Sequence, residues 1–243
     1  MHTSPSLPSG AQPGMTAGHH RAQFSARTLR PALAGAVLLV AHSSVGVAYT
    51  ATLTAAAPQA LYLQVGNGTF TGGDYTPIQG NGQPTGTPGN NATINTVSAN
   101  LALAAVGNGT AQAMTTNSTA SMSYWDGYAF CNIPAQLYIG GFYRTAGGNT
   151  AAAQVTATVP AALTDPLGDT LPFSKISWTT GGNGDGGAEP FPAGTFVNGG
   201  VQTVGTMASN TWNESCWTFS YLNNTVPKSG FYSGTVIYTM STP

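Results

Sequence analysis

Tight turns interrupt this chain at short intervals, and they constrain its fold more than any other feature. The dipeptide Asn-Gly recurs at 67–68, 81–82, 108–109, 183–184 and 198–199. Asn and Gly accept the positive φ angles that two-residue hairpin turns require. The runs between the turns are short and rich in β-branched and aromatic residues, and none shows a sustained helical period with caps. The pattern predicts an all-β protein built from antiparallel hairpins.

The candidate strands share this short, turn-bounded pattern. They cover residues 51–56, 60–65, 92–106, 111–123, 136–143, 151–159, 170–178, 195–206, 216–222 and 231–240. The run at 92–106 is long enough to contain a bend or a second strand. In the last run Tyr232, Val236, Tyr238 and Met240 fall on one face, as expected for a half-buried strand.

The first 48 residues have the layout of a secretory signal peptide. A basic region at 19–30, without acidic residues, precedes the apolar run "ALAGAVLLVA". Gly46 and Ala48 then supply small residues at the −3 and −1 positions of a cleavage after Ala48. A membrane anchor is the weaker alternative, because a span needs roughly 20 apolar residues and this run has about half that. Met15 offers a second start position.

We therefore expect an exported mature chain that is secreted, periplasmic or on the cell surface. Residues 49–243 should form a single β-sandwich domain without a transmembrane segment. Within it, residues 71–91 are polar and rich in Gly and Pro, and we expect them to form an exposed, mobile loop.

The charge of the expected mature chain excludes several functions. Cleavage after Ala48 removes all four histidines and three of the six basic residues, and leaves Arg144, Lys175 and Lys228 against seven acids, a net charge of −4. So few cations argue against a nucleic-acid partner. Without histidine, neither a Ser-His-Asp triad nor a histidine-based metal site can form. We expect no cofactor and no catalytic activity.

The two cysteines predict one disulfide. Cys131 and Cys216 are an even pair in an exported protein, which favours a disulfide over a metal, redox or nucleophilic role. A nucleophilic thiol usually needs a neighbouring base or cation, and the mature chain has few. Closing so long a loop stabilises a fold by about 4–5 kcal/mol in the chain-entropy model. Short strands with one long-range disulfide predict an antiparallel β-sandwich, immunoglobulin-like or jelly-roll-like.

Two carboxylates flank the cysteines and form a candidate site. Asp126 lies five residues before Cys131, and Glu214 lies two before Cys216, so a disulfide could bring both together. The aromatic residues near the same cysteines are Trp125, Tyr128, Trp212 and Trp217. Aromatic rings could stack on sugars, and two carboxylates beside them are the minimal equipment of a glycoside hydrolase. The alternative is structural, with Asp126 in a turn and the rings packed around the disulfide.

One loop carries oxygen ligands of the type that calcium prefers. The segment "GGNGDGGAEP" contains Asn183, Asp185 and Glu189. Their spacing does not match a full calcium-binding loop. We therefore expect a plain turn, and keep these three residues as the calcium candidates.

Two blocks of the chain resemble known exported proteins. The block "CNIPAQLYIGGFYR" and the tail from residue 211 to 243 resemble uncharacterised exported proteins of Gram-negative bacteria. The closing pattern G-x-Y-x-G-x-V-x-Y, residues 230–238, is similar to the final strands of pilin-like coat-U subunits and of WxL cell-surface domains. The Trp-x-Leu hallmark of the second group is absent, and the cysteines are not spaced like the early pair of a coat-U subunit. The resemblance implies an exported β-domain of the cell surface.

Together these features predict a non-catalytic exported β-sandwich with a structural, adhesive or assembly role at the cell surface. Its expected partners are a second copy, another surface protein or a glycan. The alternative function is a carbohydrate-binding module that uses exposed aromatic residues. A glycoside hydrolase that uses Asp126 and Glu214 is the third hypothesis.

Overall fold

The computed structural model describes residues 60–71, 87–145 and 151–243, all within one compact unit, Leu53–Pro243. The expected signal peptide, the candidate strand at 51–56 and most of the expected loop at 71–91 lie outside the described residues. Strands in antiparallel sheets make up nearly all of the regular structure, which confirms the all-β prediction. No helix in the described ranges is long and apolar enough to cross a membrane.

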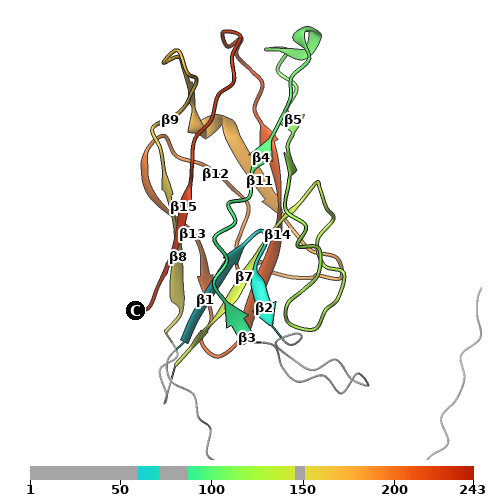
Figure 1. The fold of residues 1–243 in the computed structure, drawn as a ribbon, viewed down its shortest axis with the longest axis vertical. Helices are drawn as coiled ribbons and strands as arrows, with labels where there is room; N and C mark the ends of the chain where they lie inside the picture. The colour runs from blue at the N-terminus through green and yellow to red at the C-terminus, as the bar shows by residue number, and fades with distance from the viewer. Residues whose placement is uncertain (1–59, 72–86, 146–150) are drawn as a thin grey trace, which may run out of the picture. The chain divides into compact units, whose positions relative to one another are not determined.

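The larger sheet has the strand order β1-β7-β14-β11-β12, and β5 also pairs with β14 (Figure 1). Its strands are β1 (Ala60–Val65), β5 (Gln112–Ala113), β7 (Leu137–Arg144), β11 (Ile176–Thr180), β12 (Gly194–Thr195) and β14 (Trp212–Tyr221). Apart from β11 and β12, neighbours in this sheet are far apart in the sequence, so the chain repeatedly leaves the sheet and returns to it.

The second sheet has the order β13-β8-β15. It consists of β8 (Ala153–Val159), β13 (Gly200–Met207) and β15 (Ile237–Ser241). The smaller elements are β2 (Thr69–Thr71) with β3 (Thr87–Gly89), β4 (Val97–Ser98) with β6 (Thr115–Thr116), β9 (Ala162–Thr164) with β10 (Thr170–Pro172), and the 3₁₀ turns η1 (Leu103–Ala105) and η2 (Phe173–Lys175). The strands β2 and β3, which pair with each other, lie at the two ends of the expected loop.

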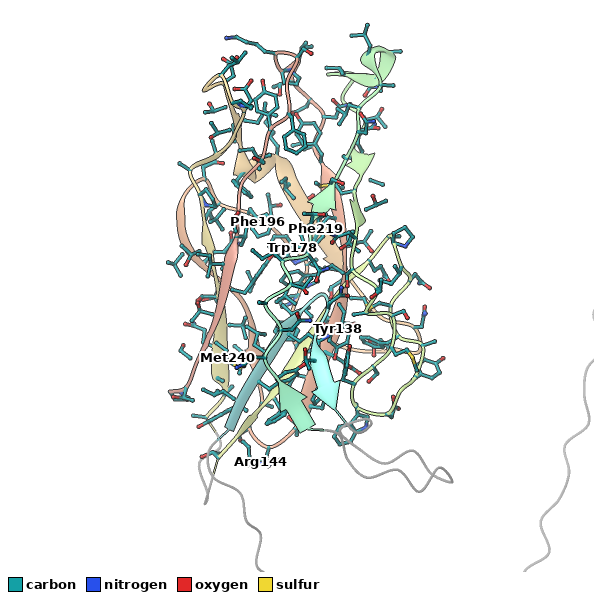
Figure 2. All side chains as sticks on the ribbon, in the orientation of Figure 1. Tyr138, Arg144, Trp178, Phe196, Phe219 and Met240 are labelled. Atoms are coloured by element: carbon teal, nitrogen blue, oxygen red, sulfur yellow. A yellow bond between two sulfur atoms is a disulfide. The ribbon has the colours of Figure 1, made fainter. Side chains whose placement is uncertain are left out.

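The hydrophobic core lies between the two sheets (Figure 2). On β8 every second residue is buried, from Ala153 to Val159, as the period of a half-buried strand requires. From the larger sheet Trp178 and Trp217 face it, with ring centroids 5.1 Å apart, and Phe196 packs 4.7 Å from the Trp178 ring. Because both sheets bury their facing sides in one core, the predicted antiparallel β-sandwich is confirmed.

Three of the candidate strands, which are rich in apolar and aromatic residues, are close to the observed ones. β1 has the predicted bounds, and β7 and β8 differ from prediction by two residues or fewer at each end. The run predicted at 170–178 is divided by η2, and the run at 195–206 is divided between the two sheets, as β12 and β13. The strand β9 was not predicted.

Two candidate strands are wrong over most of their length. The runs at 92–106 and 111–123 contain only two-residue strands and η1, because side chains there satisfy backbone groups that a longer ladder would use. The Asn117 side chain accepts from the Thr96 amide at 2.8 Å, for example. The last strand begins at Ile237 rather than 231, although Tyr238 and Met240 do pack against the core as predicted.

Candidate functional site

The strand β14 presents different residues to its two faces. Trp217 and Phe219 point into the core between the sheets. Glu214 and Cys216 lie on the opposite, outer face, where Cys216 is opposite Tyr138 of β7. The candidate site is built on this outer face of the larger sheet.

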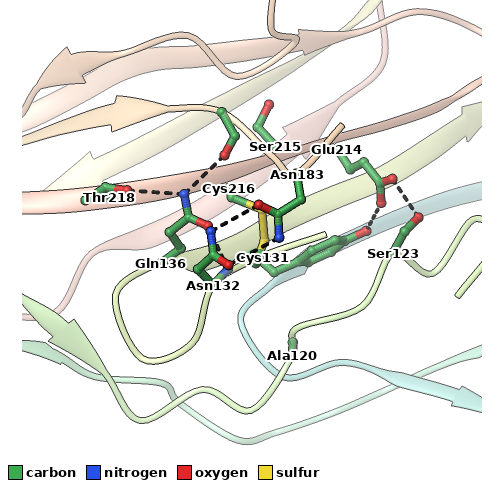
Figure 3. The surroundings of a disulfide bond; sticks show 12 residues. Ala120, Ser123, Cys131, Asn132, Gln136, Asn183, Glu214, Ser215, Cys216 and Thr218 are labelled. Atoms are coloured by element: carbon green, nitrogen blue, oxygen red, sulfur yellow. Dashed lines mark hydrogen bonds between the residues drawn. A yellow bond between two sulfur atoms is a disulfide. The ribbon is translucent and has the colours of Figure 1, made fainter. Parts of the chain in front are cut away.

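A disulfide holds a loop against that face. Cys131 and Cys216 are bonded, with Cα atoms 5.6 Å apart, which confirms the predicted pairing (Figure 3). A small second hydrophobic cluster surrounds the bond and consists of Ala120, Phe130, Cys131, Tyr138 and Cys216. The Asn183 amide donates to the Phe130 carbonyl at 2.8 Å, so the loop at 121–131 and the loop at 181–189 are bound to each other.

A pocket of about 290 Å³ opens between these two loops. Its lining residues are Ser123, Asp126, Tyr128, Phe130, Asn183, Gly184, Asp185 and Glu214. The two carboxylates flanking the cysteines, Asp126 and Glu214, therefore line one pocket, as the sequence led us to expect. Asp185 adds a third carboxylate, and no basic residue is part of the lining.

Glu214 is held in place by three donors. Its Oε1 accepts a hydrogen bond from the Ser123 hydroxyl at 2.6 Å. Its Oε2 accepts from the Tyr138 hydroxyl at 2.7 Å and from the Trp212 indole N–H at 2.8 Å. Since a carboxylate offers about four acceptor sites, one remains, on Oε1.

Burial and charge set the protonation of this carboxyl. Burial raises the pKa of Glu214 above its ordinary value, and the nearby Asp126 raises it further, while the three hydrogen bonds act in the opposite direction. The buried Tyr138 hydroxyl has a strongly raised pKa, first because of burial and then because of Glu214. Gly140 leaves room for this pair, since a Cβ there would lie 2.5 Å from the Tyr138 hydroxyl oxygen.

Two aromatic side chains of the loop are exposed, and one of them, Tyr128, lines the pocket. Tyr128 is 55% exposed and Trp125 is 38% exposed. Asp126 forms the turn between them, because its Oδ1 accepts from the Tyr128 amide at 2.9 Å. The Tyr128 ring lies against Gly184 of the opposite loop. Asp126 therefore has the structural role in a turn that was considered for it, and its carboxylate also lines the pocket.

The other two aromatic candidates are less exposed than Tyr128. Trp217 is fully buried in the core, where its indole N–H donates to the Phe191 carbonyl at 3.0 Å, so its prediction as a ligand-binding residue is wrong. Trp212 is half-buried, with ring centroids 6.1 Å from Tyr62 and 6.0 Å from Phe142. Its contribution to the site is the hydrogen bond that positions Glu214.

The three calcium candidates make different contacts and do not form one site. The Asn183 amide group donates to the Ala129 carbonyl and exchanges hydrogen bonds with the Asn132 side chain, so it joins the two loops. Asp185 and Glu189 line an adjacent pocket of about 80 Å³. Glu189 accepts from the Ser215 hydroxyl at 2.7 Å, and burial followed by Asp185 raises its pKa. In the described part of the chain, no group of three or more His, Cys, Asp or Glu side chains is arranged to hold a metal ion.

The candidate site is a pocket lined by acidic and aromatic residues, and the disulfide fastens one of its two loops to the larger sheet. The sequence indicated Asp126, Tyr128 and Glu214, but not Ser123 or Tyr138, which hold the Glu214 carboxylate. Comparisons of the chain with family models, with curated proteins and with solved structures found no match.

Proposed function

We propose that this chain is an exported, non-catalytic β-sandwich that acts in adhesion at the cell surface, and that the pocket beside the disulfide binds carbohydrate. The observation that carries the proposal is the exposed ring of Tyr128 at the edge of a pocket lined by carboxylates. The disulfide supports the location, because such bonds persist in oxidising compartments outside the cytosol.

The lining offers both kinds of contact that a sugar needs. An exposed aromatic ring such as Tyr128 provides a flat apolar surface for the C–H face of a pyranose. The remaining acceptor site of Glu214 and the carboxylates of Asp126 and Asp185 can accept hydrogen bonds from sugar hydroxyls. A concave site with few placed polar groups is the usual form of a small-ligand site.

The charge of the pocket selects among glycans. With three carboxylates in the lining and no basic residue, the site repels uronic acids, sialic acids and sulfated sugars. It suits neutral sugars and sugars that carry an ammonium group. The adhesive role is therefore directed at neutral or amino-bearing surface glycans.

A binding role fits the Glu214 environment better than hydrolysis does. Both of its oxygens already accept hydrogen bonds from protein groups, which hold the carboxylate in one orientation. A general acid must instead direct its proton toward the leaving oxygen. The shared pocket of Asp126 and Glu214 keeps the hydrolase as the second candidate. Release of reducing sugar by the wild type, abolished in Glu214→Gln, would establish it in place of the binding role.

The test is binding of neutral and amino-bearing oligosaccharides to the purified protein, first on an array and then by titration calorimetry. Tyr128→Ala should weaken the best ligand about tenfold or more, since a lost stacking surface costs about 1.4 kcal/mol or more. Phe231→Ala is the matched control, because Phe231 is 77% exposed and does not line the pocket. No binding to any such glycan, or an equal loss in both variants, would contradict the proposal.

A further inference from the structure

The strand β15 stands at the edge of the second sheet. Its residues Ile237–Ser241 pair with Thr158–Gln154 of β8, and on its other side no strand of the described ranges pairs with it. An edge strand presents backbone N–H and C=O groups that are ready to pair with another extended chain.

This edge lacks the usual features that prevent pairing. Residues 230–242 contain no charged residue and no proline, and the ladder between β15 and β8 has no bulge. The outward side chains Ile237, Thr239 and Ser241 are exposed, Ile237 by 60%. Natural edge strands commonly carry charges, prolines or bulges that block association.

The opposite edge of the same sheet is protected, in contrast. The strand β13 has a bulge between Thr203 and Gly205. Its Thr206 amide donates to the Pro190 carbonyl at 3.2 Å, so the segment that contains Pro190 covers this edge around Thr206. The difference between the two edges directs association to β15.

We propose that β15 pairs antiparallel with the β15 strand of a second copy, so that the two three-stranded sheets join in a symmetric dimer. A two-fold axis at Thr239 places Ile237 opposite Ser241, and Tyr238 opposite Met240, of the partner copy. Tyr238 and Met240 are half-buried against the core, and across the junction each ring meets a thioether of the other copy. No charged pair opposes this register.

The proposed contact is small, and this sets its strength. One strand pair buries less surface than a standard interface, so we expect dissociation in the micromolar range. Dimers should therefore form at the high local concentration of a cell surface. This association rests on β15 alone and is independent of carbohydrate binding.

The test is the mass of the purified protein, expressed from the full chain, by light scattering or sedimentation at concentrations up to about 100 μM. The wild type should approach twice the monomer mass. Thr239→Lys places two ammonium groups on the axis, and should raise the dimer dissociation constant about tenfold or more. Thr206→Lys is the matched control, because it adds the same charge to an exposed threonine of β13 and should leave the dimer unchanged.

A second measurement locates the contact. In a Thr239→Cys variant, a short bifunctional maleimide should link two copies, whereas the same reagent should not link Thr206→Cys. A monomeric wild type at all concentrations, or a dimer that Thr239→Lys leaves intact, would overturn the proposal. So would a monomer in which the β15 amides resist hydrogen exchange until residues 49–59 are deleted, because that result would assign the edge to the chain's own N-terminal segment.

Discussion

The protonation of Glu214 depends on how the folded chain surrounds its side chain. Its carboxylate is placed by one hydroxyl from the loop, one from β7 and an indole from its own strand. Because burial outweighs these hydrogen bonds, the pKa of Glu214 is raised, and the folded protein holds this proton more tightly than the unfolded chain does.

The raised pKa predicts a pH dependence of stability with a definite sign. The free energy of unfolding should fall as the pH rises from the unfolded pKa of Glu214, near 4.5, through its higher folded value, and should then level off. Glu214→Gln does not titrate, so the wild-type minus variant difference isolates this contribution. Urea unfolding of both proteins at intervals from about pH 4 to about pH 7 measures it. A difference that grows with pH would show that hydrogen bonding, rather than burial, controls this carboxyl.

Individual site residues were predictable only where the sequence itself fixes a bonding partner or the face of a strand. The pairing of Cys131 with Cys216 was predictable because no other cysteine exists. The burial of Trp217 could have been inferred from strand period, since a residue next to Cys216 points to the opposite face. Tyr138 could not be assigned to Glu214 from the sequence, because their proximity depends on the register of β7 against β14.

At the scale of elements, strands were predictable where apolar residues alternate with polar ones, as in β8, or form a short run that ends at a turn, as in β1. Strands were not predictable where polar side chains, rather than a neighbouring strand, form hydrogen bonds with the backbone. The fully buried Asn223 is an example, since its side chain donates to the carbonyls of Ala105 and Thr110 and accepts from the Gly107 amide. It holds the 105–110 segment in an irregular path that no period in that segment reveals.

The pairing of β1 with β7 depends on one glycine, and this leads to an element-scale prediction. Gly141 lies opposite Leu63 with φ +154°, and a Cβ there would collide with the Tyr62 backbone carbonyl. Because backbone cannot move aside as a flexible side chain can, Gly141→Ala should cost about 1–3 kcal/mol or more of unfolding free energy. Chemical denaturation measures the loss. Gly186→Ala is the control, since a Cβ at this position meets no atom within 4 Å, and it should change stability by less than about 0.5 kcal/mol.

At the scale of the molecule, the two proposed contacts use different layers of the sandwich. The pocket lies on the outer face of the larger sheet, and β15 is the edge of the other sheet. Ligand binding and strand pairing therefore use separate residues, and a dimer carries two pockets. Two linked sites bind a surface that displays many glycans more tightly than one site does. The β-sandwich was predictable from turns and alternation, but the separation of pocket and edge follows from strand order, which the sequence does not show.

The disulfide affects the whole molecule, because it ties the loop that forms the pocket to the central region of the larger sheet across 85 residues of chain. Replacing both cysteines, as Cys131→Ser with Cys216→Ser, should lower the unfolding free energy by about 2–5 kcal/mol. For a chain of this size, that loss corresponds to a fall in Tm of about 5–15 °C, which scanning calorimetry measures. Since the same bond holds Phe130 and Tyr128 beside Glu214, the double variant should also bind the glycan more weakly at temperatures where it is still folded. Unchanged affinity in the folded variant would mean that the hydrogen bonds between the two loops, and not the disulfide, hold the pocket in shape.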